Sequence, residues 1–495
     1  MWAVICISIA AVIHFALGFC IEFSVDEAHY ALYAQHLAWS YFDHPPLVGW
    51  IQWPLIAITT SEGIIRIIPE LLWAISMYLV YQLVLELHHL LGKLLRSKDS
   101  EKILPSATAS AFMAVLAVIA SPLPHVLAIG LLPDTLLTPL SLALMMMALR
   151  WLREPEFTTR EWIIVGILLG LAGLSKYTAA FTALALLPIF LCAPDKPWIG
   201  KKGFWLAALI AFVLILPVFY WNGAHQWISF KYQLAHGGGS AWAWHRVAAF
   251  IGIQIACFGP ALALGGVLFV KYFASINKSV LWSLLGFFLI PFTIFAALSG
   301  GGGLPHWTTP AWFCLAPFAG IGLAKAWSTR HRLTTIVIRT LLIGQIMLCI
   351  LGFGFVLAGG ITSGSAKSNP IADLYGWKSA GIKAAELANA HHLGSIAVQN
   401  WTLASRIAWY AQPLPVFVLD QHEDQFAIWF GKAPLGSNTL LIDWSGMPYP
   451  SPVGIKSGFE DCQKIDTLEI IRFGQFLSKF DFNLCTNWQG SPVTK

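Results

Sequence analysis

The sequence has little charge. Only 11% of its 495 residues are Asp, Glu, Lys or Arg, whereas 57% are hydrophobic. A soluble protein of this length would need a charged surface that so few ionisable side chains cannot form. This scarcity excludes a soluble globular protein and indicates an integral membrane protein. The net charge of +5 comes without a basic patch of interleaved aromatic residues, so we expect no nucleic-acid partner.

Several site signatures are also missing. The eight cysteines form no C-x-x-C pair and no zinc-ribbon spacing. The glycine run 300–303 lacks the G-K-[ST] ending of a P-loop, so we expect no nucleotide cofactor. The first twenty residues lack a basic start and an A-x-A-like cleavage site, which predicts a retained first helix. Cys462 and Cys485 lie in a polar region and can pair if that region faces an oxidising compartment.

Apolar runs predict about eleven transmembrane helices, each close to the roughly 20 residues that cross a bilayer. The predicted spans are residues 2–21, 66–91, 105–121, 133–152, 161–174, 177–193, 204–221, 247–270, 280–298, 307–327 and 333–358. Lysine and arginine are distributed unevenly between alternate loops, with fifteen in one set and three in the other. The positive-inside rule then places the N-terminus in the cytoplasm and the first loop outside.

The composition becomes more polar from about Thr362. We therefore expect a membrane domain over 1–361 and a small α/β domain over 362–495 on the outer face. In this second domain, we predict strands over residues 395–399, 415–419 and 439–443. We predict helices over residues 380–390 and 403–410.

The first outer loop, residues 22–65, is predicted to carry the reaction centre. It concentrates acids and histidines, and no lysine or arginine occurs between Glu22 and Thr60. Ionisable groups at a membrane surface are costly to hold and are commonly functional. Asp26, next to Glu27, can remove a proton from an acceptor; the alternative is a solvated acid at a helix end.

The remainder of this loop predicts an interfacial structure. Residues 28–40 fit an amphipathic helix with Tyr30, Tyr33 and Trp39 at the level of the lipid headgroups. Asp43 and His44 precede two prolines that fix the backbone. This pair can bind a metal ion or a phosphate, or it can form only a structural turn.

Further polar residues are predicted on the same face. Asp134 begins a span, as either a helix cap or a substrate contact. Lys176, followed by Tyr177, needs an anionic partner, which a lipid phosphate would supply; the alternative is snorkelling to the headgroups. Lys231, His236 and His306 occupy other outer loops and can reach the same site. The histidines lack metal-ligand spacing and fit interfacial hydrogen bonding equally well.

Five motifs resemble one known family in combination. They are D-E-A-H-Y, Y-F-D-H-P-P-L, L-S-K-Y-T, W-N-G-A-H-Q-W-I-S-F-K-Y-Q-L-A-H-G and P-H-W-T-T-P-A-W. Together they resemble the bacterial branch of the dolichyl-phosphate-mannose protein mannosyltransferase family, which includes ArnT. The resemblance implies a GT-C-type polytopic helical enzyme of the bacterial inner membrane. Such an enzyme moves a sugar from a polyprenyl-phosphate carrier to an acceptor on the outer face.

The resemblance also assigns roles to residues. Asp26 falls on the family's first-loop acid, the expected general base, with Glu27 as its catalytic neighbour. Asp43 falls on an acid close to a bound metal in ArnT-like members, and His236 is a tentative second ligand of a divalent ion. His44 replaces a lysine of ArnT-like sequences, which shifts the expected phosphate contact to Lys176. The other expected substrate-binding residues are Tyr30, His44, Asp134, Tyr177, Lys231 and His306.

The sequence therefore predicts a polytopic α-helical membrane glycosyltransferase with a small extracytoplasmic α/β domain. The expected donor is a polyprenyl-phosphate-linked sugar, and the expected acceptor is a glycolipid, lipid A, a glycan or a protein. The alternative is a transporter or flippase of a lipid-linked sugar. That alternative would favour polar or charged residues along interior spans and inverted repeats. We find no inverted repeat, and only Arg339, Gln345 and Asp134 give the alternative partial support.

Overall fold

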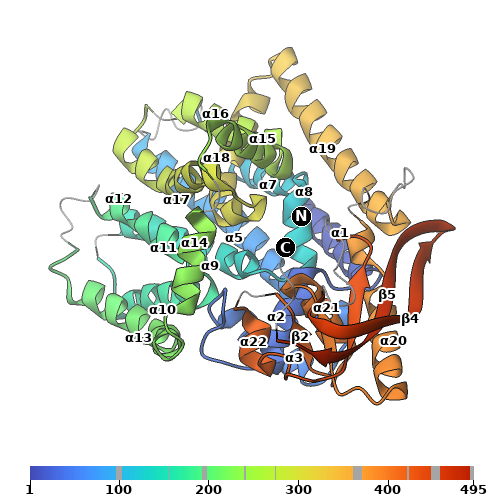
Figure 1. Ribbon diagram of the computed structural model, residues 1–495. Helices are drawn as coiled ribbons and strands as arrows, with labels where there is room; N and C mark the ends of the chain where they lie inside the picture. Colours follow the sequence, from blue (N-terminus) through green and yellow to red (C-terminus); the bar gives the residue numbers. More distant parts are fainter. Residues whose placement is uncertain are drawn as a thin grey trace. The chain divides into compact units, whose positions relative to one another are not determined.

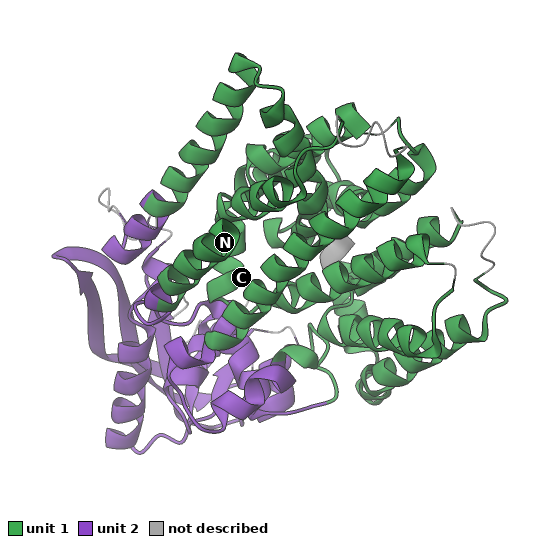
Figure 2. Ribbon diagram, turned by 180° about the vertical axis from the view of Figure 1, so that it is seen from behind, with its two compact units in different colours: residues 1–15, 39–48, 66–350 green, residues 16–38, 49–65, 351–495 purple. Residues whose placement is uncertain are grey.

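The structure is a computed structural model that describes residues 1–95, 103–154, 156–191, 198–238, 241–273, 275–360, 369, 371–420, 423–447 and 457–490, without the side chains of 236–238. The chain divides into two compact units (Figure 2). Unit 1 comprises residues 1–15, 39–48 and 66–350. Unit 2 comprises residues 16–38, 49–65 and 351–495, so it takes in parts of the predicted first loop as well as the C-terminal region.

Helices make up unit 1 (Figure 1). They are α1 (Trp2–Gly18, up to Phe15), α5 (Ile67–Leu94), α7 (Ala107–Ile119), α8 (Pro122–Ile129), α9 (Pro133–Arg153), α10 (Thr159–Ser175), α11 (Ala179–Leu184), α12 (Leu186–Leu191), α13 (Lys202–Ala224), α14 (Ile228–Gly238), α15 (Trp244–Phe258), α16 (Pro260–Phe273), α17 (Lys278–Leu298), η1 (Ser299–Gly301), η2 (Pro305–Thr308), α18 (Thr309–Ser328) and α19 (Arg332–Ala358, up to Ile350). Helix occupies every one of the eleven predicted spans. The predicted polytopic helical fold is confirmed.

The described helices differ in whether each could cross a membrane by itself. By length and composition, five helices within the described ranges are long and apolar enough, or up to seven if each bent pair counts as one span. The sequence predicted one span over 247–270, but α15 and α16 meet there at 100°. Gly259 adopts a φ of 83° at the bend, and Pro260 has no N–H to continue the helix.

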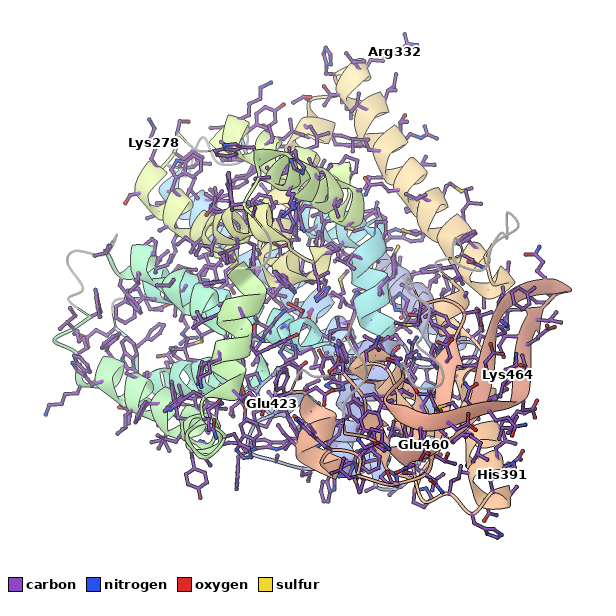
Figure 3. The ribbon with its side chains drawn as sticks, viewed as in Figure 1. Lys278, Arg332, His391, Glu423, Glu460 and Lys464 are labelled. Atoms are coloured by element: carbon purple, nitrogen blue, oxygen red, sulfur yellow. A yellow bond between two sulfur atoms is a disulfide. The ribbon has the colours of Figure 1, made fainter. Side chains whose placement is uncertain are left out.

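The core of unit 1 surrounds α18, in which every residue from Thr309 to Ala324 is buried. Small residues allow its neighbours to come close. A Cβ on Gly322 would lie 2.2 Å from the carbonyl oxygen of Gly265 on α16. By contrast, Lys278 and Arg332, the first residues of α17 and α19, project outward from their helices (Figure 3).

A series of polar side-chain contacts joins three helices of this unit. His14 of α1 places Nδ1 2.8 Å from Glu70 Oε2 of α5 and Nε2 2.7 Å from His125 Nδ1 of α8. His125 Nε2 lies 2.7 Å from the carbonyl oxygen of Ile119. These contacts fix α1 against the adjacent helices, since separating them would leave buried polar groups unpaired.

Unit 2 is an α/β structure with one sheet of order β2-β1-β3-β5-β4. Its strands are β1 (Ile396–Val398), β2 (Val416–Val418), β3 (Thr439–Trp444), β4 (Phe459–Arg472) and β5 (Gln475–Trp488). Its helices are α2 (Val25–Gln35), α3 (Leu47–Ile56, from Gly49 onward), α4 (Glu62–Ile65), η4 (Ala372–Leu374), α20 (Trp377–Ala390), α21 (Trp401–Tyr410) and α22 (Gln425–Phe430). β1 pairs in parallel with β2 and β3, whereas β5 pairs antiparallel with β3 and β4.

The three predicted strands and two predicted helices of this unit are confirmed as β1, β2, β3, α20 and α21. The long β4–β5 ribbon and α22 were not predicted. Cys462 and Cys485 face each other across that ribbon and form a disulfide. The pairing that the sequence left conditional is therefore present in the structure.

Candidate functional site

A buried ion pair lies where α10 ends and α9 begins. Lys176 follows α10 in extended conformation, and its Nζ lies 2.6 Å from Oδ2 of Asp134. The two residues are 5% and 0% exposed. Asp134 is therefore more than a helix cap, because it supplies the anionic partner that a buried lysine needs. Its second oxygen, Oδ1, is buried and has no hydrogen-bond partner within the described residues.

His306 lies beside this pair, on η2. Its Nε2 is 3.8 Å from Asp134 Oδ2. Burial lowers the pKa of the imidazole to about 4, because a low-dielectric environment disfavours the cation; nearby Asp134 opposes this shift, and Lys176 and His44 add to it. At neutral pH His306 is consequently uncharged, with one ring nitrogen available as a donor and the other as an acceptor.

The backbone of η2 is held by a glutamine that the sequence analysis did not single out. Gln254 of α15 donates from Nε2 to the carbonyl oxygen of Pro305 at 3.1 Å. Its Oε1 accepts from the indole N–H of Trp312 at 3.0 Å and from the hydroxyl of Thr308. In the sequence, the signal that could have identified it is a lone glutamine in an otherwise apolar segment. In the structure its side chain is fully buried.

Asp43 and His44 belong to a turn of unit 1 that α14 holds. Ser229 of α14 donates to the carbonyl oxygen of Tyr41 at 2.8 Å, and Gln233 donates to that of Asp43 at 2.5 Å. Within the turn, His44 Nε2 lies 3.8 Å from Asp43 Oδ2. His44 is also one of the groups that lower the pKa of His306.

Tyr177 lies next to Lys176 and contacts the same turn region. Its hydroxyl is 3.4 Å from Ser40 Oγ, and its ring centroid lies 5.2 Å from that of Phe230. Burial raises the pKa of the phenol, so the hydroxyl stays protonated and can donate. We call Asp43, His44, Asp134, Lys176, Tyr177 and His306 the unit 1 cluster. Lys231 is exposed on α14, and the side chain of His236 lies outside the described residues.

Asp26, Glu27 and Tyr30 lie in unit 2, on α2. Glu27 is part of a capping box: its Oε2 accepts from the backbone N–H and the hydroxyl of Ser24, at 3.0 and 2.9 Å. The S-x-x-E spacing at 24–27 is the sequence signature of this cap. Glu27 thus has a structural function at the start of the helix. Asp26, one residue earlier, is half-buried in the same first turn.

Tyr30 and Tyr33 were expected at headgroup level, and this expectation is wrong. They are 5% and 0% exposed within unit 2, with ring centroids 5.6 Å apart. Tyr30 also accepts a hydrogen bond at its carbonyl oxygen from Gln52 Nε2, at 3.0 Å. The helix begins at Val25 rather than at residue 28, because the Ser24–Glu27 cap starts it earlier. The apolar face that we assigned to lipid is instead part of a protein core.

The described residues do not form a recognisable metal site. No group of three His, Cys, Asp or Glu side chains in the described part of the chain is arranged to hold a metal ion. Asp43 Oδ2 lies 3.8 Å from His44 Nε2, which is a pair and not a set of three ligands. The tentative Asp43–His236 pair remains a prediction, and we assign no reaction step to a metal.

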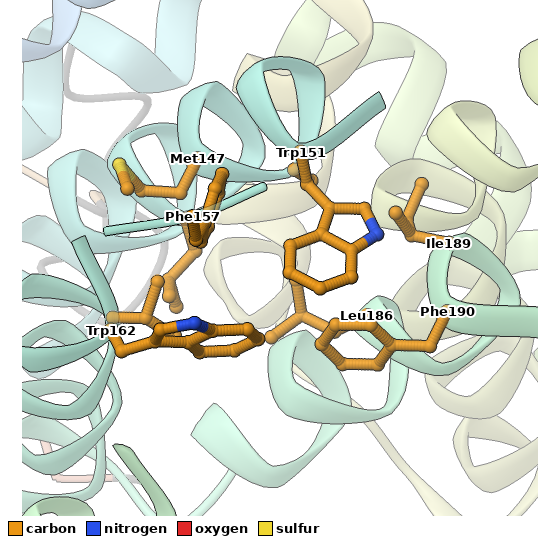
Figure 4. A pocket seen from close by; sticks show the side chains of 10 residues that line it. Met147, Trp151, Phe157, Trp162, Leu186, Ile189 and Phe190 are labelled. Carbon is orange, nitrogen blue, oxygen red and sulfur yellow. The ribbon is translucent and has the colours of Figure 1, made fainter. Parts of the chain in front are cut away.

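An apolar pocket opens at the opposite end of α9 from Asp134 (Figure 4). Its walls are apolar or aromatic side chains, among them Met147, Trp151, Trp162 and Phe190. Met147 follows Asp134 by thirteen positions on α9, which corresponds to about 20 Å along the helix axis. The residues that line this pocket include no acid, base or nucleophile.

Comparisons with known proteins agree with this architecture. Residues 102–221 match the sequence model of the family described as dolichyl-phosphate-mannose-protein mannosyltransferase. The structure resembles ArnT from Cupriavidus metallidurans in the apo state, with a TM-score of 0.59, 14% identity, and coverage of 89% of this chain and 92% of that chain. The same protein bound to undecaprenyl phosphate matches with a TM-score of 0.59, 15% identity and the same coverage. No curated protein matches the chain in a sequence search.

The fold and the matched sequence segment support one conclusion. The matched segment contains α9 and α10 and therefore the Asp134–Lys176 pair. The chain is a polytopic membrane glycosyltransferase with the GT-C fold, similar to ArnT and to the dolichyl-phosphate-mannose-protein mannosyltransferases.

Proposed function

We propose that the protein transfers a sugar from a polyprenyl-phosphate carrier to an acceptor on the outer face of the bacterial inner membrane. The acceptor is a glycolipid, lipid A, a glycan or a protein. In this proposal residues 362–495 form a periplasmic domain and the N-terminus is cytoplasmic. The observation that carries it is the buried Lys176 ammonium, held by one oxygen of Asp134 beside an uncharged His306. The ArnT structure with bound undecaprenyl phosphate supports the same class of donor.

The Lys176 ammonium is suited to bind the carrier phosphate. Its three N–H groups can donate three hydrogen bonds, and the Asp134 contact uses one of them. The remaining donors can meet phosphate oxygens in a site from which water is largely excluded, where such bonds are stronger. Asp134 offsets the lysine charge when the site holds no phosphate. The neutral His306 can add one further donor without a full positive charge.

The transfer step follows from these roles. The Asp26 carboxylate takes the proton from the acceptor hydroxyl or amine as that atom attacks the anomeric carbon. The bond between the anomeric carbon and the phosphate oxygen breaks, and the polyprenyl phosphate leaves with the electron pair. Lys176 stabilises the negative charge that develops on the leaving oxygen. Attack opposite the leaving group inverts the anomeric configuration.

Mass spectrometry of lipid extracts tests the proposal. Cells that carry Asp26→Ala should accumulate a polyprenyl-phosphate-linked sugar that wild-type cells consume, and its mass identifies the sugar class. Normal consumption of that lipid by folded Asp26→Ala protein would contradict the assignment of the base. A lipid-linked sugar that is only redistributed between the leaflets would favour the transporter or flippase alternative instead.

A further inference from the structure

The chain segment that enters α2 is attached to a distant part of unit 2. Glu22 Oε2 accepts the backbone N–H groups of Trp377 and Lys378, at 2.6 and 3.2 Å. These N–H groups form the first turn of α20, whose own N-cap, Gly376, provides no side-chain hydrogen bond. A carboxylate 355 residues earlier in the sequence therefore caps the helix. The contact fixes the chain four residues before Asp26.

The hydroxyl of Tyr410 fixes Phe23, the residue that follows Glu22. Tyr410, the last residue of α21, accepts the backbone N–H of Phe23 at 3.0 Å and donates to Glu62 Oε1 at 2.8 Å. Burial, together with the charge of Glu62, raises the pKa of the phenol, so it remains a donor at all physiological pH values. A single atom thus connects α21 to the segment before α2 and to the start of α4.

Further contacts continue along α2. His29 Nδ1 lies 3.0 Å from Ser405 Oγ, and the amides of Gln35 and Gln412 exchange hydrogen bonds at 3.2 and 3.0 Å. In Figure 1, α2 and α21 lie together, and Figure 2 draws both in unit 2. The helix that carries Asp26 is therefore tied at its entry, middle and end to the C-terminal part of the chain.

Helix α21 also carries a buried charge. Arg406, adjacent to Ser405, is 1% exposed, pairs with Asp373 and lies with its guanidinium carbon 3.5 Å from the ring centroid of Trp377. Burial lowers the pKa of the guanidinium, while the carboxylates of Asp373 and Asp26 act in the opposite direction. The C-terminal part of unit 2 thus supplies a buried cation whose charged form the Asp26 carboxylate favours.

We propose that the C-terminal part of unit 2 positions α2 for catalysis and that Tyr410 is its principal positioning residue. This inference rests on the proposed role of Asp26 as the base. Tyr410 does not touch the reacting atoms; it fixes the backbone three residues before the carboxylate. A misplacement of about 1 Å at a reacting group can reduce a rate by about a hundredfold, so loss of one anchoring hydroxyl is expected to slow the reaction measurably.

The test compares Tyr410→Phe with a matched control, Tyr375→Phe. The control removes a hydroxyl from the same unit, one that donates to the carbonyl oxygen of Val356 at 2.6 Å and not to the α2 segment. For Tyr410→Phe we expect kcat to fall about tenfold or more, with unchanged affinity for undecaprenyl phosphate. We also expect faster amide hydrogen exchange across residues 25–35. Tyr375→Phe should change neither kcat nor the amide exchange of residues 25–35.

Each outcome is decisive. Unchanged exchange in α2, or wild-type kcat despite faster exchange, would overturn the positioning role of Tyr410. The Asp26→Asn variant, measured in parallel, separates this failure from that of the proposed function. If Asp26→Asn retains wild-type kcat, the assignment of the base is wrong whatever Tyr410→Phe does. If only Asp26→Asn loses activity, the base stands and the positioning proposal falls.

Discussion

His14 Nδ1 and Glu70 Oε2 lie 2.8 Å apart in a contact between α1 and α5. The carbonyl oxygen of Ile119 can only accept, so His125 must carry a hydrogen on Nε2 and, when neutral, accept at Nδ1. His14 therefore donates from Nε2 to His125. Its Nδ1 then either bears a proton that faces the Glu70 carboxylate or accepts one from the Glu70 carboxylic acid. Either arrangement joins α1 to α5.

We predict that loss of the Glu70 carboxyl group destabilises the protein severely. Glu70→Ala leaves His14 without its buried partner, which should cost about 3 kcal/mol of unfolding free energy. Glu70→Gln should cost less than half as much, because the amide can still donate to Nδ1. Thermal unfolding in detergent measures both variants. Glu386→Ala, an exposed acid on α20, is the control, and equal losses for Glu70→Ala and the control would contradict the prediction.

Substitution of Lys176 should separate stability from ligand binding. Lys176→Met leaves Asp134 buried without its cation, so we expect both a lower melting temperature and weaker binding of undecaprenyl phosphate. Adding Asp134→Asn should restore most of the stability, since no unpaired charge remains, but not the binding. Lys278→Met, at an exposed lysine that begins α17, should preserve both. Restored binding in the double variant would argue against a phosphate contact at Lys176.

The two neighbouring acids of α2 should behave differently. Glu27→Ala removes a helix cap and should cost about 1 kcal/mol of stability while much of the transfer activity remains. Asp26→Asn should abolish transfer and leave the melting temperature within a few degrees of wild type. The measurements are thermal unfolding and consumption of the lipid-linked sugar. The reverse pattern would transfer the role of the base to Glu27.

Stability should depend on pH through His306. Its folded-state pKa, about 4, lies below the usual value of 6.5, so the unfolded chain binds more protons between these values. The His306 contribution is therefore fully present above pH 6.5 and is lost as the pH falls towards 4, by at most about 1.4 kcal/mol per pH unit. His306→Asn should show a smaller loss of melting temperature between pH 7 and pH 4.5. If the melting temperatures of the wild type and of His306→Asn fell by the same amount between pH 7 and pH 4.5, the contribution of His306 would be refuted.

The disulfide between Cys462 and Cys485 should be detectable by mass. Intact protein treated with a reductant should gain the mass of two hydrogen atoms, whereas Cys462→Ser protein should gain none. Closure of the loop of 23 residues should contribute about 3 kcal/mol to the stability of unit 2. An unchanged mass would show that the two thiols are free.

Hydropathy predicted the helices of unit 1, because burial in lipid or protein selects the same apolar residues. It did not predict the break between α15 and α16, since Gly259 and Pro260 fit within an apolar window while they change the direction of the backbone. The Asp134–Lys176 pair was equally hidden. The residues are 42 positions apart, and only packing of α9 against α10 brings them together.

In unit 2, short buried strands were predictable, whereas the β4–β5 ribbon was not. β4 has the sequence F-E-D-C-Q-K-I-D-T-L-E-I-I-R, in which most side chains are exposed or half-buried, so no regular apolar alternation marks it. The position of α2 could not be predicted either. Its partners, such as Ser405 and Tyr410, lie more than 370 residues later in the sequence.

The cap that Glu22 places on α20 has a consequence for biosynthesis. Trp377 is translated 355 residues after Glu22. At roughly 5–20 residues per second, the ribosome needs on the order of 20–70 s after Glu22 to reach Trp377. During that interval the nascent Asp26 helix lacks its α20 and α21 partners. The acid is thus made early but can be fixed in place only after α20 and α21 have been synthesised.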